Sequence, residues 1–258
     1  MNVTAKGLRV LVTAGAAGIG RVIARTFAEN GARVHVCDID AKALEEIKHA
    51  LPAITRTLAD VAIQADVERL FEDVKRELGG LEVLVNNAGI AGPTAKIEDI
   101  RPEDWERCIA VDLTGMFYVT RRAMPLIKAA GGGSIINLSS AAGRLGFARR
   151  TPYSAAKWGV VGFTQSLAIE AGPDKVRVNC IQPGVVEGDR IERVIDAKAK
   201  SLGITNQEMR DRLLEGTSLR TTVQAQEIAD MALYLATDPG RHITGQSLAV
   251  CGGARYLV

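Results

Sequence analysis

Several features that would define other classes of protein are scarce or missing in this sequence. Aromatic residues make up only 4% of the chain, and 32 Lys and Arg residues against 30 Asp and Glu residues leave a net charge of +2. That balance gives no electrostatic footprint for nucleic acid or for an anionic membrane. The chain contains no apolar run of about 18 residues, so we expect no membrane-spanning helix.

The four cysteines are too few and too dispersed for a disulfide framework. Cys37, Cys108, Cys180 and Cys251 are 71 or more residues apart, and none belongs to a C-x-x-C pair. The three histidines are scattered without metal-ligand spacing, so we predict no metal site. The N-terminus lacks the cationic start and continuous apolar stretch of a signal peptide. We therefore expect free thiols and a cytoplasmic location.

What the sequence does contain is an alternation of short apolar runs with segments of helical periodicity. The helical segments repeat apolar residues at helix spacing, as in Val67, Leu70, Phe71 and Val74. The runs expected to form strands cover residues 8–12, 33–37, 55–58, 81–85, 134–138, 176–181 and 247–250, and the third is the weakest. Strand–helix alternation predicts a parallel sheet with helices on both faces. With no linker in between, residues 1–258 read as one α/β domain.

One segment departs from this alternation. Between Pro183 and the helix expected near Gln224 lie about 40 residues without a strand, and residues 189–216 resemble one or two polar helices. A long excursion of this kind in a compact domain is usually a functional element. We therefore predict a substrate lid at residues 188–216.

A glycine-rich turn follows the first predicted strand. Residues 13–20 read TAGAAGIG, and a helix is expected to start at their end. Backbone without Cβ can approach a pyrophosphate closely, and a helix N-terminus supplies free N–H groups. We predict that Gly15, Gly18, Ile19 and Gly20 bind a dinucleotide, although the spacing is not G-x-G-x-x-G. The alternative is that these small residues only let helix and strand pack closely.

The second predicted strand leads into Asp38, 18 residues after Gly20. A carboxylate at this place can accept a hydrogen bond from a ribose 2′-hydroxyl and would repel a 2′-phosphate. Since residues 15–20 contain no Lys or Arg to attract an extra phosphate, we predict NAD rather than NADP. Asp38 could instead cap the next helix, but Asp40 is better placed for that.

A phenol and an ammonium stand four residues apart in Tyr153 and Lys157, a spacing that places both on one helix face. A nearby ammonium favours the phenolate, which can then act as a base near neutral pH. Ser140 follows the predicted strand at 134–138 and precedes Tyr153 by 13 residues. Because α/β sheets bind ligands at the carboxyl ends of their strands, we expect Ser140 and Tyr153 to share a substrate oxygen.

Together these motifs resemble the short-chain dehydrogenase/reductase family over nearly the whole chain. Further matching elements are Asp60-Val61, Asn86-Asn87-Ala88-Gly89, Trp105, Pro183-Gly184, and Thr244-Gly245-Gln246 through Gly252-Gly253. The resemblance implies a Rossmann-like doubly wound sheet of about seven strands in the order 3-2-1-4-5-6-7. It also implies a nicotinamide cofactor and a homo-oligomer, either a tetramer or a dimer.

The resemblance further implies roles for single residues. Ser140 would polarise the substrate oxygen, Tyr153 would exchange its proton, and Lys157 would bind the nicotinamide ribose and favour the phenolate. Asp60 and Val61 would contact the adenine. The remaining cofactor contacts that it implies are Asn87 at the adjacent ribose, Ala88, Gly89, Pro183, Gly184 and the backbone of Val186.

Three positions depart from the family pattern. Ala14 replaces the first glycine of the turn, and Gly188 replaces a threonine that often contacts the carboxamide. Asp112 replaces an asparagine whose backbone carbonyl is thought to hold a water in a proton relay to the lysine. We keep Asp112 in the catalytic set and favour this backbone role, because Asp has the same main chain. The alternative is an electrostatic role for its carboxylate.

The sequence thus predicts an NAD-dependent oxidoreductase that transfers a hydride between nicotinamide and a secondary alcohol or ketone of a small polar substrate. The alternatives are a 3-oxoacyl thioester reductase, which Asp38 disfavours because such enzymes mostly use NADPH, and a catalytically silent NAD-binding sensor or scaffold. Five arginines near the expected pocket could hold a carboxylate, phosphate or sulfonate: Arg144, Arg149, Arg150, Arg190 and Arg193. We favour a surface or subunit contact for them, because the lid also carries acidic residues.

Overall fold

The computed structural model describes residues 3–258. Residues 1 and 2, which begin the segment in which we expect no signal peptide, lie outside the described residues. Seven strands form one parallel sheet in the order β3-β2-β1-β4-β5-β6-β7. They are β1 (Arg9–Thr13), β2 (Arg33–Asp38), β3 (Thr55–Leu58), β4 (Val83–Asn86), β5 (Gly133–Leu138), β6 (Val176–Pro183) and β7 (Ser247–Val250). The fold predicted from the sequence is confirmed, with strand ends displaced by at most two residues.

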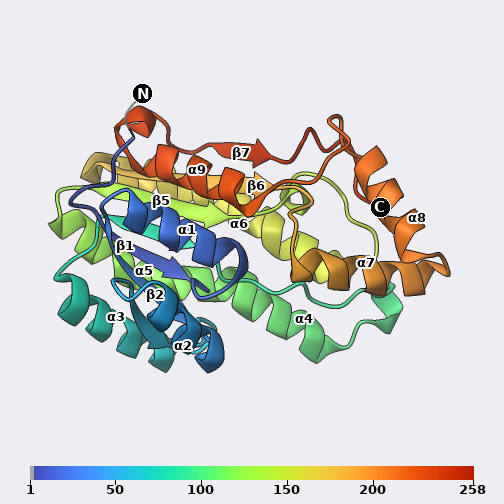
Figure 1. Cartoon of the computed structure of the whole chain (residues 1–258), viewed down its shortest axis with the longest axis horizontal. Coiled ribbons are helices and arrows are strands. Elements are labelled where there is room, and N and C mark those ends of the chain that lie inside the picture. The colour runs from blue at the N-terminus through green and yellow to red at the C-terminus, as the bar shows by residue number, and fades with distance from the viewer. Residues whose placement is uncertain (1–2) are drawn as a thin grey trace.

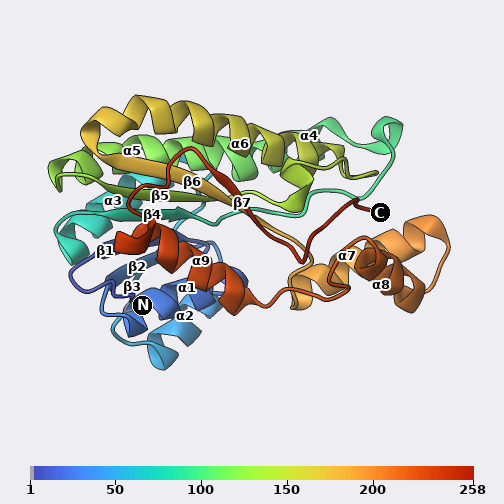
Figure 2. The same ribbon diagram turned by 90° about the horizontal axis from the view of Figure 1, so that it is seen from above.

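Helices cover both faces of the sheet (Figures 1 and 2). The α-helices are α1 (Gly18–Glu29), α2 (Ala41–Ala50), α3 (Gln64–Leu78), α4 (Pro102–Ile109), α5 (Gly115–Ala129), α6 (Thr151–Ala171), α7 (Asp189–Leu202), α8 (Asn206–Glu215) and α9 (Ala225–Ala236). Figure 2 shows α5 and α6 on one side of the sheet and α1, α2 and α9 on the other. None of the helices in the described part of the chain has the length and apolarity needed to cross a membrane.

Two hydrophobic cores lie on opposite faces of the sheet because successive strand side chains point to opposite sides. In β1, Val10 and Val12 belong to the core under α1 and α9, whereas Leu11 belongs to the core under α3 and α5. Both faces are covered, so the central strands are apolar almost throughout, as in β4 with Val83, Leu84 and Val85. The sheet is therefore a rigid platform for the groups at its carboxyl edge.

The segment expected to form a lid contains the two helices α7 and α8, which lie together beyond β6 (Figure 1). Their inner faces contribute Ile195, Ala199, Met209 and Leu213 to a small core, which is completed by Val185, two residues after β6. A capping box starts α8: the Thr205 hydroxyl accepts from the Glu208 N–H, and the Glu208 carboxylate accepts from the Thr205 N–H.

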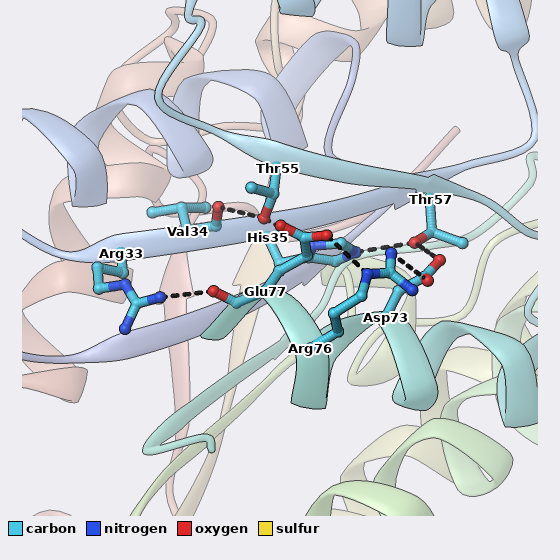
Figure 3. Close-up of polar contacts among 8 residues, drawn as sticks. All are labelled: Arg33, Val34, His35, Thr55, Thr57, Asp73, Arg76 and Glu77. Atoms are coloured by element: carbon cyan, nitrogen blue, oxygen red, sulfur yellow. Dashed lines mark hydrogen bonds and ion pairs between the residues drawn. The ribbon is translucent and has the colours of Figure 1, made fainter. Parts of the chain in front are cut away.

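A buried histidine links the edge of the sheet to α3 (Figure 3). His35 of β2 places Nδ1 2.7 Å from the Thr55 hydroxyl and Nε2 3.0 Å from the Thr57 hydroxyl. The Thr57 hydroxyl in turn donates to Asp73 at 2.6 Å. Burial lowers the pKa of His35 to about 4. The imidazole is therefore neutral at physiological pH, and both ring nitrogens have partners.

Candidate active site

In the glycine turn between β1 and α1, the backbone lies close to neighbouring residues, as the small residues of the sequence suggested. The Gly15 N–H donates to the Cys37 carbonyl at 3.0 Å, and a Cβ on Gly15 would lie 2.6 Å from the Val36 side chain. A Cβ on Gly20 would lie 2.1 Å from the Ala14 carbonyl oxygen. Both glycines thus have a packing reason, because a larger residue would push the turn away from the sheet.

The outer side of the same turn is open. Gly18 has φ +51°, and a Cβ there would meet nothing within 4 Å. Ala17, the N-cap of α1, offers no side-chain hydrogen bond, and the first turn of the helix has no acidic residue. The first N–H groups of α1 are therefore available, and this arrangement fits a phosphate group.

Asp38, the last residue of β2, is held beside this turn. Its carboxylate is 9% exposed and accepts hydrogen bonds from the Ala16 N–H at 3.1 Å and the Asp40 N–H at 3.2 Å. Asp40 is the residue that caps α2, where its side chain accepts from the N–H groups of Lys42 and Ala43. The alternative role of Asp38 as that cap is therefore wrong, and its charge stays fixed at the mouth of the crevice.

Asn87, after β4, stabilises the turn rather than standing free. Its side-chain amide donates to the carbonyl oxygens of Thr13 and Ala14, both at 3.0 Å. The N–H groups of Asn87 and Ala88 both donate to the Thr13 hydroxyl at 3.0 Å. β1 and β4 are neighbours where the strand order reverses, the place at which open α/β sheets bind ligands. These contacts close that crevice at its base.

The predicted adenine contacts lie after β3. The Asp60 carboxylate accepts from the Ala62 N–H at 2.9 Å and from Arg107 at 2.8 Å. Val61 is 5% exposed and packs against α5, where a Cβ on Gly115 would lie 2.8 Å from its side chain. The structure places both residues at the carboxyl edge of the sheet, with Asp60 engaged by protein groups.

Tyr153 and Lys157 lie near each other on α6, which packs against the turn Ala141–Gly143 that follows Ser140 at the end of β5. Ser140 follows the strand, and its hydroxyl oxygen accepts from the Ala142 N–H at 3.1 Å. Tyr153 lies in the first turn of α6, and the Lys157 ammonium one turn later is 5.5 Å from the centre of its ring. Lys157 also donates to the Leu138 carbonyl at 3.1 Å. The helix-face prediction from the spacing is thus met.

Asp112 lies in a π-helical turn, Ala110–Thr114, between α4 and α5. One carboxylate oxygen accepts from the Ile90 N–H at 2.7 Å, and the other lies 3.3 Å from the Lys157 ammonium. Both side chains of this ion pair are buried. A Cβ on Gly89 would lie 3.2 Å from each of the two charged groups. The contact with Lys157 favours the electrostatic role of Asp112 over the backbone role that we preferred.

The remaining predicted cofactor contacts follow β6. Pro183 is its last residue, and the Gly184 N–H donates to the Val250 carbonyl at 2.9 Å. Val186 forms a parallel bridge with Val223, so its backbone runs beside the segment that leads from α8 to α9. These positions lie at the carboxyl edge of the sheet, on the same side as the glycine turn.

The five arginines of the predicted pocket separate into three groups. Arg144 and Arg149 donate to main-chain oxygens of other segments, and Arg190 and Arg193 are exposed on α7. Arg150 alone is buried, at 2% exposed. The expectation of a surface contact for all five is therefore wrong for Arg150.

Sequence reasoning missed Lys198, which is 2% exposed on α7. It follows Ile195 by three residues and precedes Ala199, both of which are buried in the small core between α7 and α8. A lysine on the apolar face of an amphipathic helix was the available signal. Its ammonium lies 4.2 Å from the ring centre of Phe147, beside the N-terminus of α6.

The four cysteines are free and buried. Desolvation raises the pKa of the Cys37 thiol to about 12 and that of the Cys108 thiol to about 11. Neither thiol is therefore a thiolate nucleophile, because the thiolate is the reactive form.

Residues 14–255 match the family model described as enoyl-(acyl carrier protein) reductase. The chain is 34% identical over 252 residues to D-beta-hydroxybutyrate dehydrogenase of Rhizobium meliloti (strain 1021), covering 94% of this chain and 96% of the relative. This protein belongs to the short-chain dehydrogenase/reductase family.

Two solved structures extend the comparison to three dimensions. NAD⁺-bound xylitol dehydrogenase superimposes with a TM-score of 0.92 at 25% identity, covering 98% of this chain and all of the other. A variant of actinorhodin polyketide ketoreductase with NADPH gives 0.91 at 32% identity, covering 98% and 99%. The fold and the oxidoreductase class are thus shared, whereas the two relatives hold different cofactors.

Proposed function

We propose that this protein is an NAD-dependent oxidoreductase that interconverts a secondary alcohol and a ketone of a small polar substrate, with Tyr153 as the acid/base. The observation that carries the proposal is the approach of the Lys157 ammonium to the Tyr153 ring on α6, with Ser140 at the end of β5, on the carboxyl edge of the sheet where the open glycine turn also lies. The relatives named for hydroxybutyrate and xylitol support a small polar substrate.

The protein's own groups handle the proton. In oxidation the Tyr153 phenolate accepts the proton of the substrate hydroxyl, and the Ser140 hydroxyl donates a hydrogen bond to the same oxygen. In reduction the phenol returns that proton to the carbonyl oxygen. The buried Lys157 ammonium lies 5.5 Å from the centre of the Tyr153 ring, so a positive charge stands beside the phenol that exchanges the proton. A bound nicotinamide supplies the hydride acceptor or donor, which is the difficult part of the chemistry.

Asp38 supports NAD as the cofactor. Its carboxylate is held by two main-chain N–H groups at the end of β2, where a ribose 2′-hydroxyl can donate to it. A 2′-phosphate at the same place would meet a fixed negative charge. The remaining cofactor contacts proposed are the turn glycines with Ile19, and Asp60, Val61, Asn87, Ala88, Gly89, Pro183, Gly184 and the Val186 backbone.

The decisive test is turnover of a panel of secondary alcohols with NAD by wild-type protein and by Tyr153→Phe. The variant should lose kcat by on the order of a thousandfold while cofactor still binds, because general acid–base catalysis contributes about 10²–10⁴. Tyr234→Phe, on α9 across the sheet, is the matched control. Near-normal turnover by Tyr153→Phe would assign the proton transfer to another group, and no turnover of any alcohol by wild type would favour the silent sensor.

A 3-oxoacyl thioester reductase is the second candidate. It is favoured by the likeness to polyketide ketoreductase, a structure that contains NADPH. The two candidates differ in cofactor and in direction. Faster reduction of an acetoacetyl thioester with NADPH than oxidation of any free alcohol with NAD would select the second candidate.

We also propose that the protein assembles into a homo-oligomer, a tetramer or a dimer. Large apolar side chains are exposed on adjacent helices: Phe117 of α5 at 44%, and Trp158 and Ile169 of α6 at 51% and 82%. Such groups are the usual content of a subunit interface. Sedimentation equilibrium tests the assembly, and a monomer at micromolar concentration would refute it. The four free cysteines agree with a cytoplasmic location.

A further inference from the structure

Arg150, the residue before α6, is buried with most of its hydrogen-bonding capacity unused. One terminal nitrogen, Nη2, donates to the Ala91 carbonyl at 2.5 Å. Its other two nitrogens, Nε and Nη1, are buried and have no partner among residues 3–258. Buried polar groups are normally paired with a hydrogen-bond partner. The two free nitrogens of Arg150 therefore call for an acceptor from outside the described residues.

The unsatisfied guanidinium lies at the reacting end of the site. Its central carbon is 5.1 Å from the ring centre of Tyr153 and 5.2 Å from that of Phe147. An acceptor bound by Arg150 would therefore lie within the length of a short molecule from the Tyr153 phenol. Arg144 also has one buried nitrogen, Nε, without a partner. This residue as a whole is only partly buried, and its Nη2 already donates to the Ala254 carbonyl.

The same region has an excess of positive charge. Lys198 shares the Phe147 ring with Arg150, donates to the Val258 main-chain oxygen, and has no carboxylate partner among the ion pairs of the described residues. Burial and the Arg150 charge lower the pKa of Lys198 to about 8. The carboxylate of Asp112 is also buried, but it already forms an ion pair with Lys157.

Two buried cations beside one ring, with no Asp or Glu side chain of the described residues paired to either, are a destabilising arrangement, since desolvation and mutual repulsion both act against it. An anion bound at the two free nitrogens of Arg150 would relieve both effects. α7 contacts the segment just before α6: the Lys198 ammonium lies 4.2 Å from the Phe147 ring centre, and Arg149 donates to the Ser201 carbonyl at 2.6 Å. The helix that carries Lys198 is thus held beside Arg150.

We propose that Arg150 is the specificity residue for a negatively charged substrate, a small hydroxy acid whose carboxylate or sulfonate binds its guanidinium while the carbinol faces Tyr153. Lys198 adds positive charge behind it. This assignment rests on the proposed dehydrogenase function and gives its substrate class. Arg150 takes no part in proton transfer.

Substrates matched in shape but not in charge test the proposal by kinetics. The panel contains 3-hydroxybutyrate, 2-hydroxypropane-1-sulfonate and methyl 3-hydroxybutyrate, each with wild type, Arg150→Gln and Arg150→Lys. Wild type should favour the anions over the ester, and Arg150→Gln should lose on the order of a hundredfold in kcat/KM on the preferred anion alone. Arg150→Lys should recover part of that loss. The anion with the higher kcat/KM in wild type shows whether the site prefers a carboxylate or a sulfonate.

Arg149→Gln is the matched control, because this neighbour has a main-chain partner and should reduce anion and ester turnover equally. A structural role for Arg150 also predicts equal losses on both. Wild-type preference for the ester, or equal losses in Arg150→Gln, would overturn the proposal.

A binding measurement keeps the proposal independent of turnover and of the folding of one variant. Butyrate should raise the Tm of wild type and of Arg149→Gln, whereas the neutral butyramide should not, since a ligand stabilises only the state that binds it. Arg150→Gln and Arg150→Met should show no butyrate effect. If no alcohol is oxidised but this pattern holds, the dehydrogenase proposal fails and the anion site stands. Equal shifts with butyrate and butyramide, or no shift with either, would refute the anion site.

Discussion

The cofactor half and the substrate half of this molecule use their polar groups in opposite ways. Around β1, β2 and β4, most polar groups are paired: Asn87 holds the turn, Asp38 takes two N–H groups, and His35 has partners on both nitrogens, while the buried Oδ1 of Asn86 lacks a partner but carries no charge. Around α6 and α7, Arg150 and Lys198 are buried, no Asp or Glu side chain of the described residues pairs with either, and two nitrogens of Arg150 have no hydrogen-bond partner. The first half recognises its ligand by backbone shape, and the second recognises it by charge that the fold leaves uncompensated.

The largest expected effect is on the cofactor half and concerns His35. Its pKa is about 4 in the folded protein and about 6.5 when unfolded. The unfolded state therefore binds more protons between these values, and stability falls as pH drops from 6.5 toward 4. The loss reaches about 3 kcal/mol near pH 4.

Urea unfolding at pH 7 and pH 4.5 measures this loss, and His35→Gln should reduce the pH dependence. The exposed His49→Gln is the control and should behave as wild type. If the stability of His35→Gln falls with pH as much as that of wild type, other groups are responsible. The contacts of His35 with Thr55 and Thr57 are then not the acid-sensitive part of the cofactor half.

A slightly smaller effect is expected in the substrate half for Asp112→Asn. An amide in place of the carboxylate puts a donor against either Lys157 or the Ile90 N–H, whichever way it is turned. We expect the free energy of unfolding to fall by about 2–3 kcal/mol, because the lysine loses its buried counter-ion.

The control is Asp174→Asn at the half-exposed pair with Lys128, where at most about 1 kcal/mol should be lost. Turnover of the same variants separates the two roles of Asp112. Unchanged stability, with kcat within tenfold of wild type, would restore the backbone role.

Cofactor choice is the next effect in size. Asp38→Ala with a basic residue at position 39 should shift the ratio of kcat/KM values from NAD toward NADP by about 30-fold, about 2 kcal/mol. Asp40→Ala should weaken the start of α2 without this shift, because Asp40 only caps that helix. Wild type preferring NADP would contradict the assignment outright.

The smallest effect concerns Ala14, which has φ +48°, a left-handed conformation that favours glycine. Ala14→Gly should stabilise the protein by about 0.5–1 kcal/mol, since relief of the Cβ contact exceeds the added freedom of the unfolded chain. Ala17→Gly, at φ −140°, should give no such gain. A loss of stability in Ala14→Gly would mean that Ala14, which replaces a glycine of the family pattern, adopts its left-handed conformation without strain.

Much of this architecture could be predicted from the sequence because parallel strands and amphipathic helices have distinct periods. All seven strands and the helix carrying Tyr153 and Lys157 follow from local pattern. The contact of Asp112 with Lys157 does not, because it joins two helices through a π-helical turn that has no period of its own. Arg150 is one of five similar arginines in the sequence; its burial against the Phe147 and Tyr153 rings, which depends on tertiary packing, is what distinguishes it.

The small core between α7 and α8 has a consequence for how this chain can diversify. Ile195, Ala199, Met209 and Leu213 pack with one another and with Val185, and no residue of a strand belongs to this cluster. Changes on this helical hairpin therefore leave the packing of the main sheet largely intact. A lineage carrying this fold can exchange the hairpin for one of different length or charge and acquire a new substrate, while the inherited catalytic edge continues to work unchanged.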